Sequence, residues 1–241
     1  MLPKKGNTPK NIKAITLKAM AVILVAAIIL GLNIKVIKSA NKIKAADVIS
    51  VGQHLTFGRY EQDGDEANGA EIIQWSVLDL KDGKALLISD KLLDCKPYND
   101  EQNEVTWETC TLRKWLNGDF INTAFSESEQ KKIVLSNIHN PYNPSYSTQG
   151  CANTDDRVFV LSVDEVKKYF SSSDDSKTSI THFVALKQHK LRYYTYDNWW
   201  LRTPGSSNSA ASTMSNDGNS LSGYNVDCEY IGVRPAMWIE I

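Results

Sequence analysis

One uninterrupted uncharged segment near the N-terminus constrains the fold of this chain more than any other feature. No residue from Ala19 to Ile34 is charged, and the stretch is 16 residues long. A helix needs about 20 apolar residues to cross about 30 Å of hydrocarbon, and lysine stems at both ends extend its reach. We therefore expect a single transmembrane anchor over 19–34, with a basic tail over 1–18 and a lysine-rich stalk over 35–50.

A cleaved signal peptide is the alternative interpretation of the same segment, because its apolar region is of similar length. Cleavage requires small residues one and three places before the cut. A cut after Ala40 would have Lys38 as the residue three places before it, and a cut after Ala45 would have Ile43 there. Neither residue is small, so neither position fits well. The alternative of a protein secreted after cleavage stays open, as does that of a buried core helix.

The charge distribution supports an exported body. Nine of the 27 lysine and arginine residues precede the first acidic residue, Asp47, which leaves 18 basic and 28 acidic residues in the remainder. An acidic body argues against a nucleic-acid partner, because phosphate binding needs a positive face. The tail of 1–18 contains no foldable domain, so we expect 51–241 to be extracytoplasmic and the membrane to be a partner through the N-terminal helix.

The cysteine count is compatible with an oxidising compartment, because four cysteines can form two disulfides in three different pairings. The alternative is four free thiols in the core. The candidates are Cys95, Cys110, Cys151 and Cys228.

The pattern of 51–241 predicts one α+β domain of short antiparallel strands with two to three helices. Asp82-Gly83 between two apolar runs predicts a hairpin. Thr106 is a candidate cap for a helix over 107–117, and capping boxes at Ser126 and Ser162 predict helices over 127–135 and from 163 to about 170. Long polar loops in compact domains are often functional, and 137–156 predicts one.

Three spaced groups of motifs carry a family resemblance. They are Trp107-Glu-Thr-Cys-Thr-Leu-Arg-Lys-Trp-Leu-Asn117 with Ala124-Phe-Ser-Glu-Ser-Glu129, then Asp156-Arg-Val-Phe-Val-Leu-Ser162, and finally Trp199-Trp-Leu-Arg-Thr-Pro-Gly205 with Gly232-Val-Arg-Pro-Ala-Met-Trp238. In this order they resemble the bacterial domain of unknown function family 6273, found in exported proteins of gut-type Firmicutes, over about 54–241.

The closing pattern is more distantly similar to C-type-lectin-like folds, including the formylglycine-generating enzymes. That likeness implies a C-type-lectin-like domain whose last strand pairs with its first, and fold analogy alone implies no activity.

No catalytic signature stands out, so we expect no enzyme and no cofactor. The nucleophile elbow Gly-x-Ser-x-Gly is missing, although a Ser–His–Asp or Cys–His group could still assemble in space. Formylglycine-type chemistry uses a close cysteine pair near the C-terminal end, where Cys228 stands alone. The cysteine spacings lack the close ligand pairs of structural zinc sites, so no metal site is expected. Adjacent acids such as Asp155 and Asp156 are interpreted as solvated loop residues.

Candidate ligand-binding residues lie near the C-terminal end. Trp199, Trp200 and Arg202 follow a run of tyrosines, and aromatic side chains are common in recognition surfaces. Asn216 and Asp217 supply oxygen ligands in a polar turn, for which a plain hairpin turn is the alternative. An ordinary buried strand is the alternative for the tryptophans. We expect a binding module for a glycan or a cell-surface protein, with a hydrolase or formylglycine-type oxidase and a non-catalytic structural envelope domain as rivals.

Overall fold

The structure is a computed structural model that describes residues 49–176, 178–191, 197–215 and 220–241. The chain divides into two units, Met1–Ile49 and Ser50–Ile241, and the second is the subject here. The expected anchor over 19–34 lies outside the described residues. Within the described part, the structure contains no helix with the length and apolarity needed to span a bilayer.

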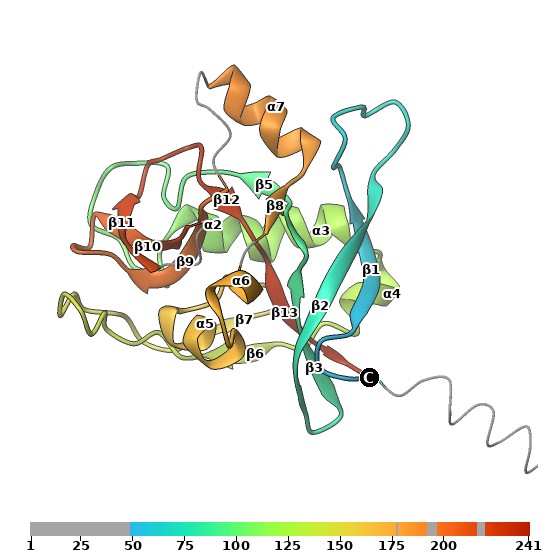
Figure 1. Ribbon diagram of the computed structural model, residues 1–241, viewed down its shortest axis with the longest axis horizontal. Helices are drawn as coiled ribbons and strands as arrows, with labels where there is room; N and C mark the ends of the chain where they lie inside the picture. Colours follow the sequence, from blue (N-terminus) through green and yellow to red (C-terminus); the bar gives the residue numbers. More distant parts are fainter. Residues whose placement is uncertain (1–48, 177, 192–196, 216–219) are drawn as a thin grey trace, which may run out of the picture. The chain divides into compact units, whose positions relative to one another are not determined.

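The first sheet has four strands in the order β1-β2-β3-β13 (Figure 1). Its strands are β1 (His54–Tyr60), β2 (Glu71–Lys81), β3 (Lys84–Ser89) and β13 (Ala236–Glu240). Neighbouring strands pair antiparallel throughout. The predicted hairpin is confirmed, because Asp82 and Gly83 form the β2–β3 turn with φ of 51° and 72°. Left-handed backbone angles of this kind match the twist of the strands they join.

A bulge in β1 brings this sheet against the helices. Its register with β2 shifts between Thr56 and Arg59, and Gly58 lies there with φ of 71°. A Cβ on Gly58 would lie 2.6 Å from the carbonyl oxygen of Ala124, so glycine permits the close approach. The indole Nε1 of Trp75 in β2 donates to the carbonyl oxygen of Phe57, 2.7 Å away.

The second sheet has five strands in the order β11-β10-β9-β12-β5. Its strands are β5 (Asp94–Cys95), β9 (Trp199–Pro204), β10 (Ala210–Met214), β11 (Ser220–Asn225) and β12 (Gly232–Val233). Only the β12–β9 pair is parallel among the described pairs of this sheet. The C-terminal segment joins the two sheets, because β12 belongs to this one and β13 to the first (Figure 1).

Short helices cover the sheets. A continuous helical segment contains α2 (Thr111–Trp115), a π-helical turn η1 (Leu116–Phe120) and α3 (Ile121–Ala124). The others are α4 (Glu127–Gln130), α5 (Val163–Tyr169), α6 (Ser173–Ser176) and α7 (His182–Lys190). Two small two-stranded sheets pair β4 (Lys91–Leu92) with β8 (Ser179–Ile180) and β6 (Ser136–Ile138) with β7 (Thr154–Asp156).

The local capping predictions have mixed outcomes. The capping boxes at Ser126 and Ser162 are confirmed. The cap predicted at Thr106 is wrong, because α2 begins after Cys110, whose Sγ accepts from the backbone N–H of Arg113. This helical segment also continues past Gly118, where the sequence predicted its end.

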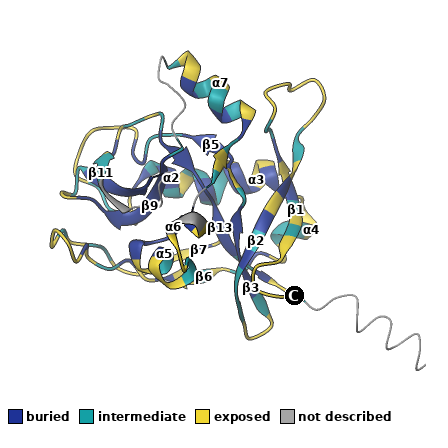
Figure 2. Cartoon of the chain, in the orientation of Figure 1, coloured by how far each residue is buried: buried dark blue, intermediate teal, exposed yellow. Residues whose placement is uncertain are grey.

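The mixed α/β class with mostly antiparallel strands is confirmed, but the expected partner of the last strand is not. Among the described strands, β13 pairs with β3, while β1 lies at the opposite edge of the same sheet. Figure 2 shows where the core lies: β5, β9, β10 and β12 of the second sheet are buried, while α7 and the connecting loops carry many exposed residues.

Candidate functional site

The structure places the predicted aromatic platform in the core. Trp199 and Trp200 are both 0% exposed, and every residue of β9 is buried. The indole Nε1 of Trp200 donates to the carbonyl oxygen of Lys96 at 2.8 Å, and its ring packs edge-on against Tyr98. The surface predicted from these two residues is therefore wrong, because β9 has neighbouring strands on both sides and both its faces are covered.

Arg202 is a structural residue. Its guanidinium is buried and donates to the carbonyl oxygens of Val160 at 2.9 Å and His139 at 3.0 Å, and it forms an ion pair with Glu165. Because Arg202 is only 3% exposed and most of its donors are used in these contacts, it does not face a ligand at the surface. The two remaining candidates, Asn216 and Asp217, lie outside the described residues.

All four cysteines are free thiols in the structure, so the disulfides considered for Cys95, Cys110, Cys151 and Cys228 are not formed. Cys95 and Cys110 are fully buried. Burial raises the pKa of Cys95 to about 11 and that of Cys110 to about 12. Since the thiolate is the nucleophile, neither sulfur is prepared for covalent catalysis at neutral pH.

His54, Asp90 and Ser76 lie together beside the first sheet and are the three residue types of a hydrolytic triad. Their hydrogen bonds, however, do not have the order that a catalytic triad needs. His54 Nδ1 lies 2.7 Å from an oxygen of Asp90, and Ser76 Oγ donates to the other oxygen at 2.6 Å. The serine also faces Nδ1, at 3.5 Å. In a catalytic triad the serine proton goes to the nitrogen that the carboxylate does not bind. Here the carboxylate holds the serine proton directly, so the histidine cannot activate Ser76.

The adjacent acids Asp155 and Asp156 have different environments. Asp155 is exposed, as expected, but Asp156 is fully buried and accepts short hydrogen bonds from three side chains. Its donors are Arg113 Nε at 2.6 Å, Trp107 Nε1 at 2.9 Å and Thr154 Oγ1 at 2.7 Å. This carboxylate therefore ties α2 to β7 and is not a solvated loop residue.

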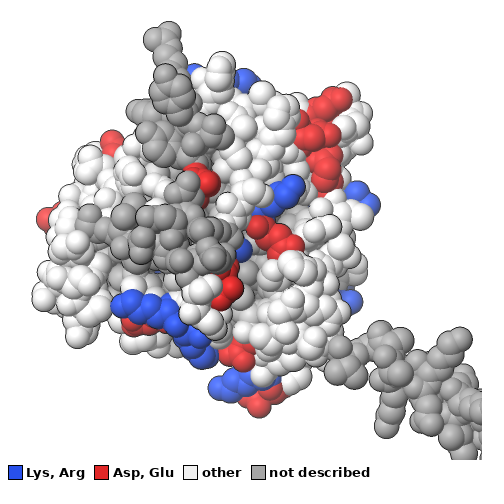
Figure 3. Space-filling view, viewed as in Figure 1, with Lys and Arg blue, Asp and Glu red and all other residues white. Residues whose placement is uncertain are grey.

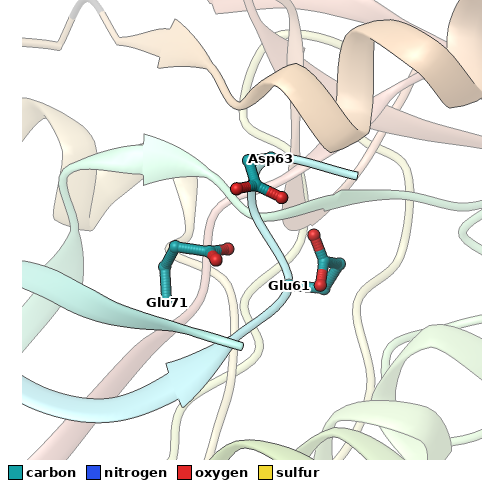
Figure 4. A group of neighbouring side chains, drawn as sticks. All are labelled: Glu61, Asp63 and Glu71. Carbon is teal, nitrogen blue, oxygen red and sulfur yellow. The ribbon is translucent and has the colours of Figure 1, made fainter. Parts of the chain in front are cut away.

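Sequence reasoning missed a group of three carboxylates in the β1–β2 connection. Oxygens of Glu61, Asp63 and Glu71 lie within 4.8 Å of one another and converge from its two arms (Figure 4). Figure 3 shows acidic side chains gathered over this connection. Such oxygens suit a hard cation. Each carboxylate, however, already accepts a backbone N–H or an amide within the loop, and the hydrogen bond from Asn68 contributes most to lowering the pKa of Asp63. The loop hydrogen bonds account for the arrangement.

A candidate for recognition of a small molecule lies beside α2. A depression of about 370 Å³ has Pro97, Leu112 and Trp115 as its apolar wall. Its polar lining consists of Lys96, Asp100, Thr111, Lys114 and Asp119. The Trp115 ring is only half-buried.

The local backbone explains that exposure. The π-helical turn η1 begins immediately after Trp115, and it contains Asp119. An extra residue in such a turn changes the angular phase of the helix, and these turns are frequent at functional sites. The Trp115 ring lies against Phe120, with 5.2 Å between centroids, while the Lys96 ammonium lies 5.1 Å from its centroid. The ring is thus held in a defined position with polar groups around it.

A larger depression, of about 460 Å³, lies between β1 and the α3–α4 segment, but its charged groups are engaged. Glu129 accepts from the backbone N–H groups of Gly58 and Ser126, and Arg59 donates to the carbonyl oxygen of Ala70. In the Trp115 depression, by contrast, the side chains of Asp100, Lys114 and Asp119 have no hydrogen-bond or ion-pair partner among the described residues. We therefore take the Trp115 depression as the candidate site.

Comparisons with known proteins bear on the family of the chain. No curated protein matches it, and no solved structure matches it either. The model of one protein family, described as a domain of unknown function, matches residues 82–241. This range contains all the motifs that carried the resemblance, the whole second sheet, and strands β3 and β13 of the first sheet. Because the match extends over well more than half of the 241 residues, the chain belongs to the domain of unknown function family DUF6273.

Proposed function

We propose that this protein is a membrane-tethered extracytoplasmic module that binds carbohydrate in the Trp115 depression. The observation that carries the proposal is the half-buried Trp115 ring, which lies among polar side chains of which Asp100, Lys114 and Asp119 have no hydrogen-bond or ion-pair partner among the described residues. Tryptophan offers a large rigid apolar face, on which the C–H face of a sugar ring can stack. Ligand sites characteristically combine such an apolar surface with a few placed polar groups.

The polar lining suits a ligand rich in hydroxyl groups. Asp100 and Asp119 can accept hydrogen bonds from hydroxyls, and Lys96 and Lys114 can donate to their oxygens. The backbone N–H of Asp100 donates to Thr111 Oγ1 at 3.0 Å, which ties the 96–100 segment to the start of α2. Both sides of the depression are therefore held together before a ligand arrives, and preorganisation of this kind lowers the cost of binding.

The tether and the exported location are part of the same proposal. They rest on the uncharged segment 19–34 and on the excess of acidic residues after it. A C-type-lectin-like architecture for 51–241 is likewise proposed from the closing motifs, with the reservation that β13 pairs with β3 and not with the first strand.

The rival functions make different demands on the structure. A serine hydrolase would need a histidine that can take the proton of Ser76, and the geometry around Asp90 opposes this. A purely structural envelope domain would need no recognition surface at all. We prefer the binding module because the charged side chains of Asp100, Lys114 and Asp119 surround the Trp115 ring without a hydrogen-bond or ion-pair partner in the part of the chain that the structure describes.

The test is carbohydrate binding by the full-length protein in lipid nanodiscs. A glycan array identifies a binding oligosaccharide, and calorimetry measures its dissociation constant for the wild-type protein and for Trp115→Ala. Trp238→Ala is the matched control, because Trp238 is also half-buried and lines a different depression. Truncation of a central aromatic residue typically costs about 2 kcal/mol or more, so we expect at least about a tenfold loss for Trp115→Ala.

Two results would refute the proposal. Equal affinities of the wild type and Trp115→Ala would remove Trp115 from the site. Failure of every oligosaccharide on the array to bind would favour the structural envelope domain. Near-ultraviolet circular dichroism of both variants checks that the core tryptophans keep their packing.

A further inference from the structure

The chain enters the domain at one end of the first sheet, as the pairing of its strands shows. Lys81 pairs with Lys84 across the β2–β3 turn, and Glu240 of β13 pairs with the same Lys84. The backbone N–H of Gly52 donates to Val77 in the same half of β2, and that of Ile241 donates to Gly83 in the turn. The entry at Ser50, the β2–β3 turn and Ile241 therefore share one end of the sheet, as Figure 1 shows.

This end exposes large apolar side chains. Val51 is 61% exposed, Leu135 is 60% exposed and Ile241 is 54% exposed. Leu135 lines a depression of about 350 Å³ together with the half-buried Trp238 and Val134. Val51 lies at the β1 edge of this end and Leu135 beside β13 at the opposite edge, so exposed apolar side chains flank the end across the width of the sheet. Exposed apolar groups on one face of a domain can mark an interaction site.

The charges at this end are almost balanced, unlike those of the rest of the domain. Lys81, Lys84 and Asp82 line the depression, and none of these side chains has an ion-pair partner among the described residues. Lys132 and Glu240 lie beside them, joined by a backbone hydrogen bond of 2.9 Å. Three lysines thus meet two acidic side chains, whereas the chain from Asp47 onward has 18 basic and 28 acidic residues. An anionic lipid surface therefore repels this end of the first sheet less than it repels the acidic remainder of the domain.

We propose that this face, formed by Val51, Lys81, Lys84, Leu135 and Trp238, rests on the surface of the lipid bilayer that holds the tether. The inference relies on the membrane tether of the proposed function. Tryptophan favours the headgroup level of a bilayer, and lysine stems can lie along apolar surface with their ammonium groups in water near the phosphates. Leu135 and Val51 enter the boundary between headgroups and acyl chains.

The position of the chain entry singles out lipid as the occupant of this face. The 48 residues that precede the described chain include the proposed anchor, and they are covalently joined to the domain at this end. A stalk over 35–48 spans at most about 50 Å when fully extended. Such a link holds the face near the bilayer at a high effective concentration, so even a weak contact is occupied.

The test measures the depth of Trp238 in the full-length protein. The protein is reconstituted in vesicles of phosphatidylcholine and phosphatidylglycerol, in which brominated lipids quench tryptophans that lie near the bilayer. We expect quenching in the wild type and in Trp115→Phe, and its loss by at least about half in Trp238→Phe. Leu135→Glu, at an exposed position, should also reduce quenching because it places a charge against the acyl boundary.

The outcomes separate this inference from the proposed function. Equal quenching of Trp238→Phe and Trp115→Phe, in protein that floats with the vesicles, would overturn the lipid-contact face and leave the tether intact. Protein that fails to float would overturn both. A shift of Trp238 emission on addition of inorganic phosphate without vesicles would show a free-phosphate site and would also overturn the lipid contact.

Discussion

The Asp156→Ala substitution tests the reasoning about the core most directly. Asp156 is 0% exposed and accepts three short hydrogen bonds, from Arg113, Trp107 and Thr154. Its removal leaves the Trp107 indole N–H and the Thr154 hydroxyl without their acceptor, and it leaves the Arg113 guanidinium without its counter-ion.

The magnitude follows from burial. Removing one member of a buried ion pair costs about 3–5 kcal/mol. The Arg113 side chain is 23% exposed, so water can reach part of the released charge, and we expect about 3 kcal/mol. The neighbouring Asp155→Ala is the matched control. Asp155 is exposed and accepts from Asn137 Nδ2 at 2.8 Å, a surface contact expected to contribute less than about 1 kcal/mol.

Urea unfolding of the full-length protein in mild detergent, followed by near-ultraviolet circular dichroism, measures both free energies of unfolding. The signal reports the buried tryptophans, of which Trp107 is the direct partner of Asp156. Unfolding free energies for the two variants within about 1 kcal/mol of each other would refute the assignment of Asp156 as the residue that ties α2 to β7.

Two further predictions concern stability. Burial raises the pKa of Cys95 from 9.0 to about 11 and that of Cys110 from 9.0 to about 12, so the folded state retains thiol protons that the unfolded state loses. The contribution of these thiols to the free energy of unfolding is complete below pH 9 and is lost as pH rises from there toward 12, by up to about 1.4 kcal/mol per pH unit for each thiol. Urea titrations at pH 8 and pH 10 should therefore show a lower free energy of unfolding at pH 10. The double variant Cys95→Ala with Cys110→Ala should show a smaller decrease between the two pH values. Gly58→Ala should destabilise by about 2 kcal/mol or more, because its Cβ would meet the Ala124 carbonyl oxygen and its φ is positive, while Gly69→Ala, with positive φ but open space, should cost about 1 kcal/mol. Similar melting temperatures for the two glycine variants would contradict the close approach of β1 to α3.

Local features were predictable where a few adjacent residues decide the conformation. The β2–β3 turn follows from Asp82-Gly83, and the capping boxes at Ser126 and Ser162 follow from side chains three residues apart. Each depends on backbone angles or hydrogen bonds within one turn of chain. The start of α2 was not predictable in this way, because Thr106 is a better general cap than Cys110, the residue that the structure uses.

The candidate site was not predictable from the same kind of pattern. Trp115, Trp199 and Trp200 are chemically identical, and each occurs in a run that could serve either core or surface. Pairing of β9 with strands on both sides buries two of them, and the π-helical turn after Trp115 leaves the third half-exposed. Asp155 and Asp156 show the same limit, since adjacent residues of a strand point to opposite faces and only the tertiary partner distinguishes them.

The sequence by itself determined the family, the mixed α/β class and the positions of the tight turns, because these depend on composition, spacing and interactions within a few residues. Only the tertiary structure decided which tryptophan is accessible, that the four cysteines are free and that the Ser76 hydroxyl donates its hydrogen bond to Asp90. Each of these depends on contacts between segments far apart in the chain. The burial and hydrogen bonding that fix them arise only when those segments pack together.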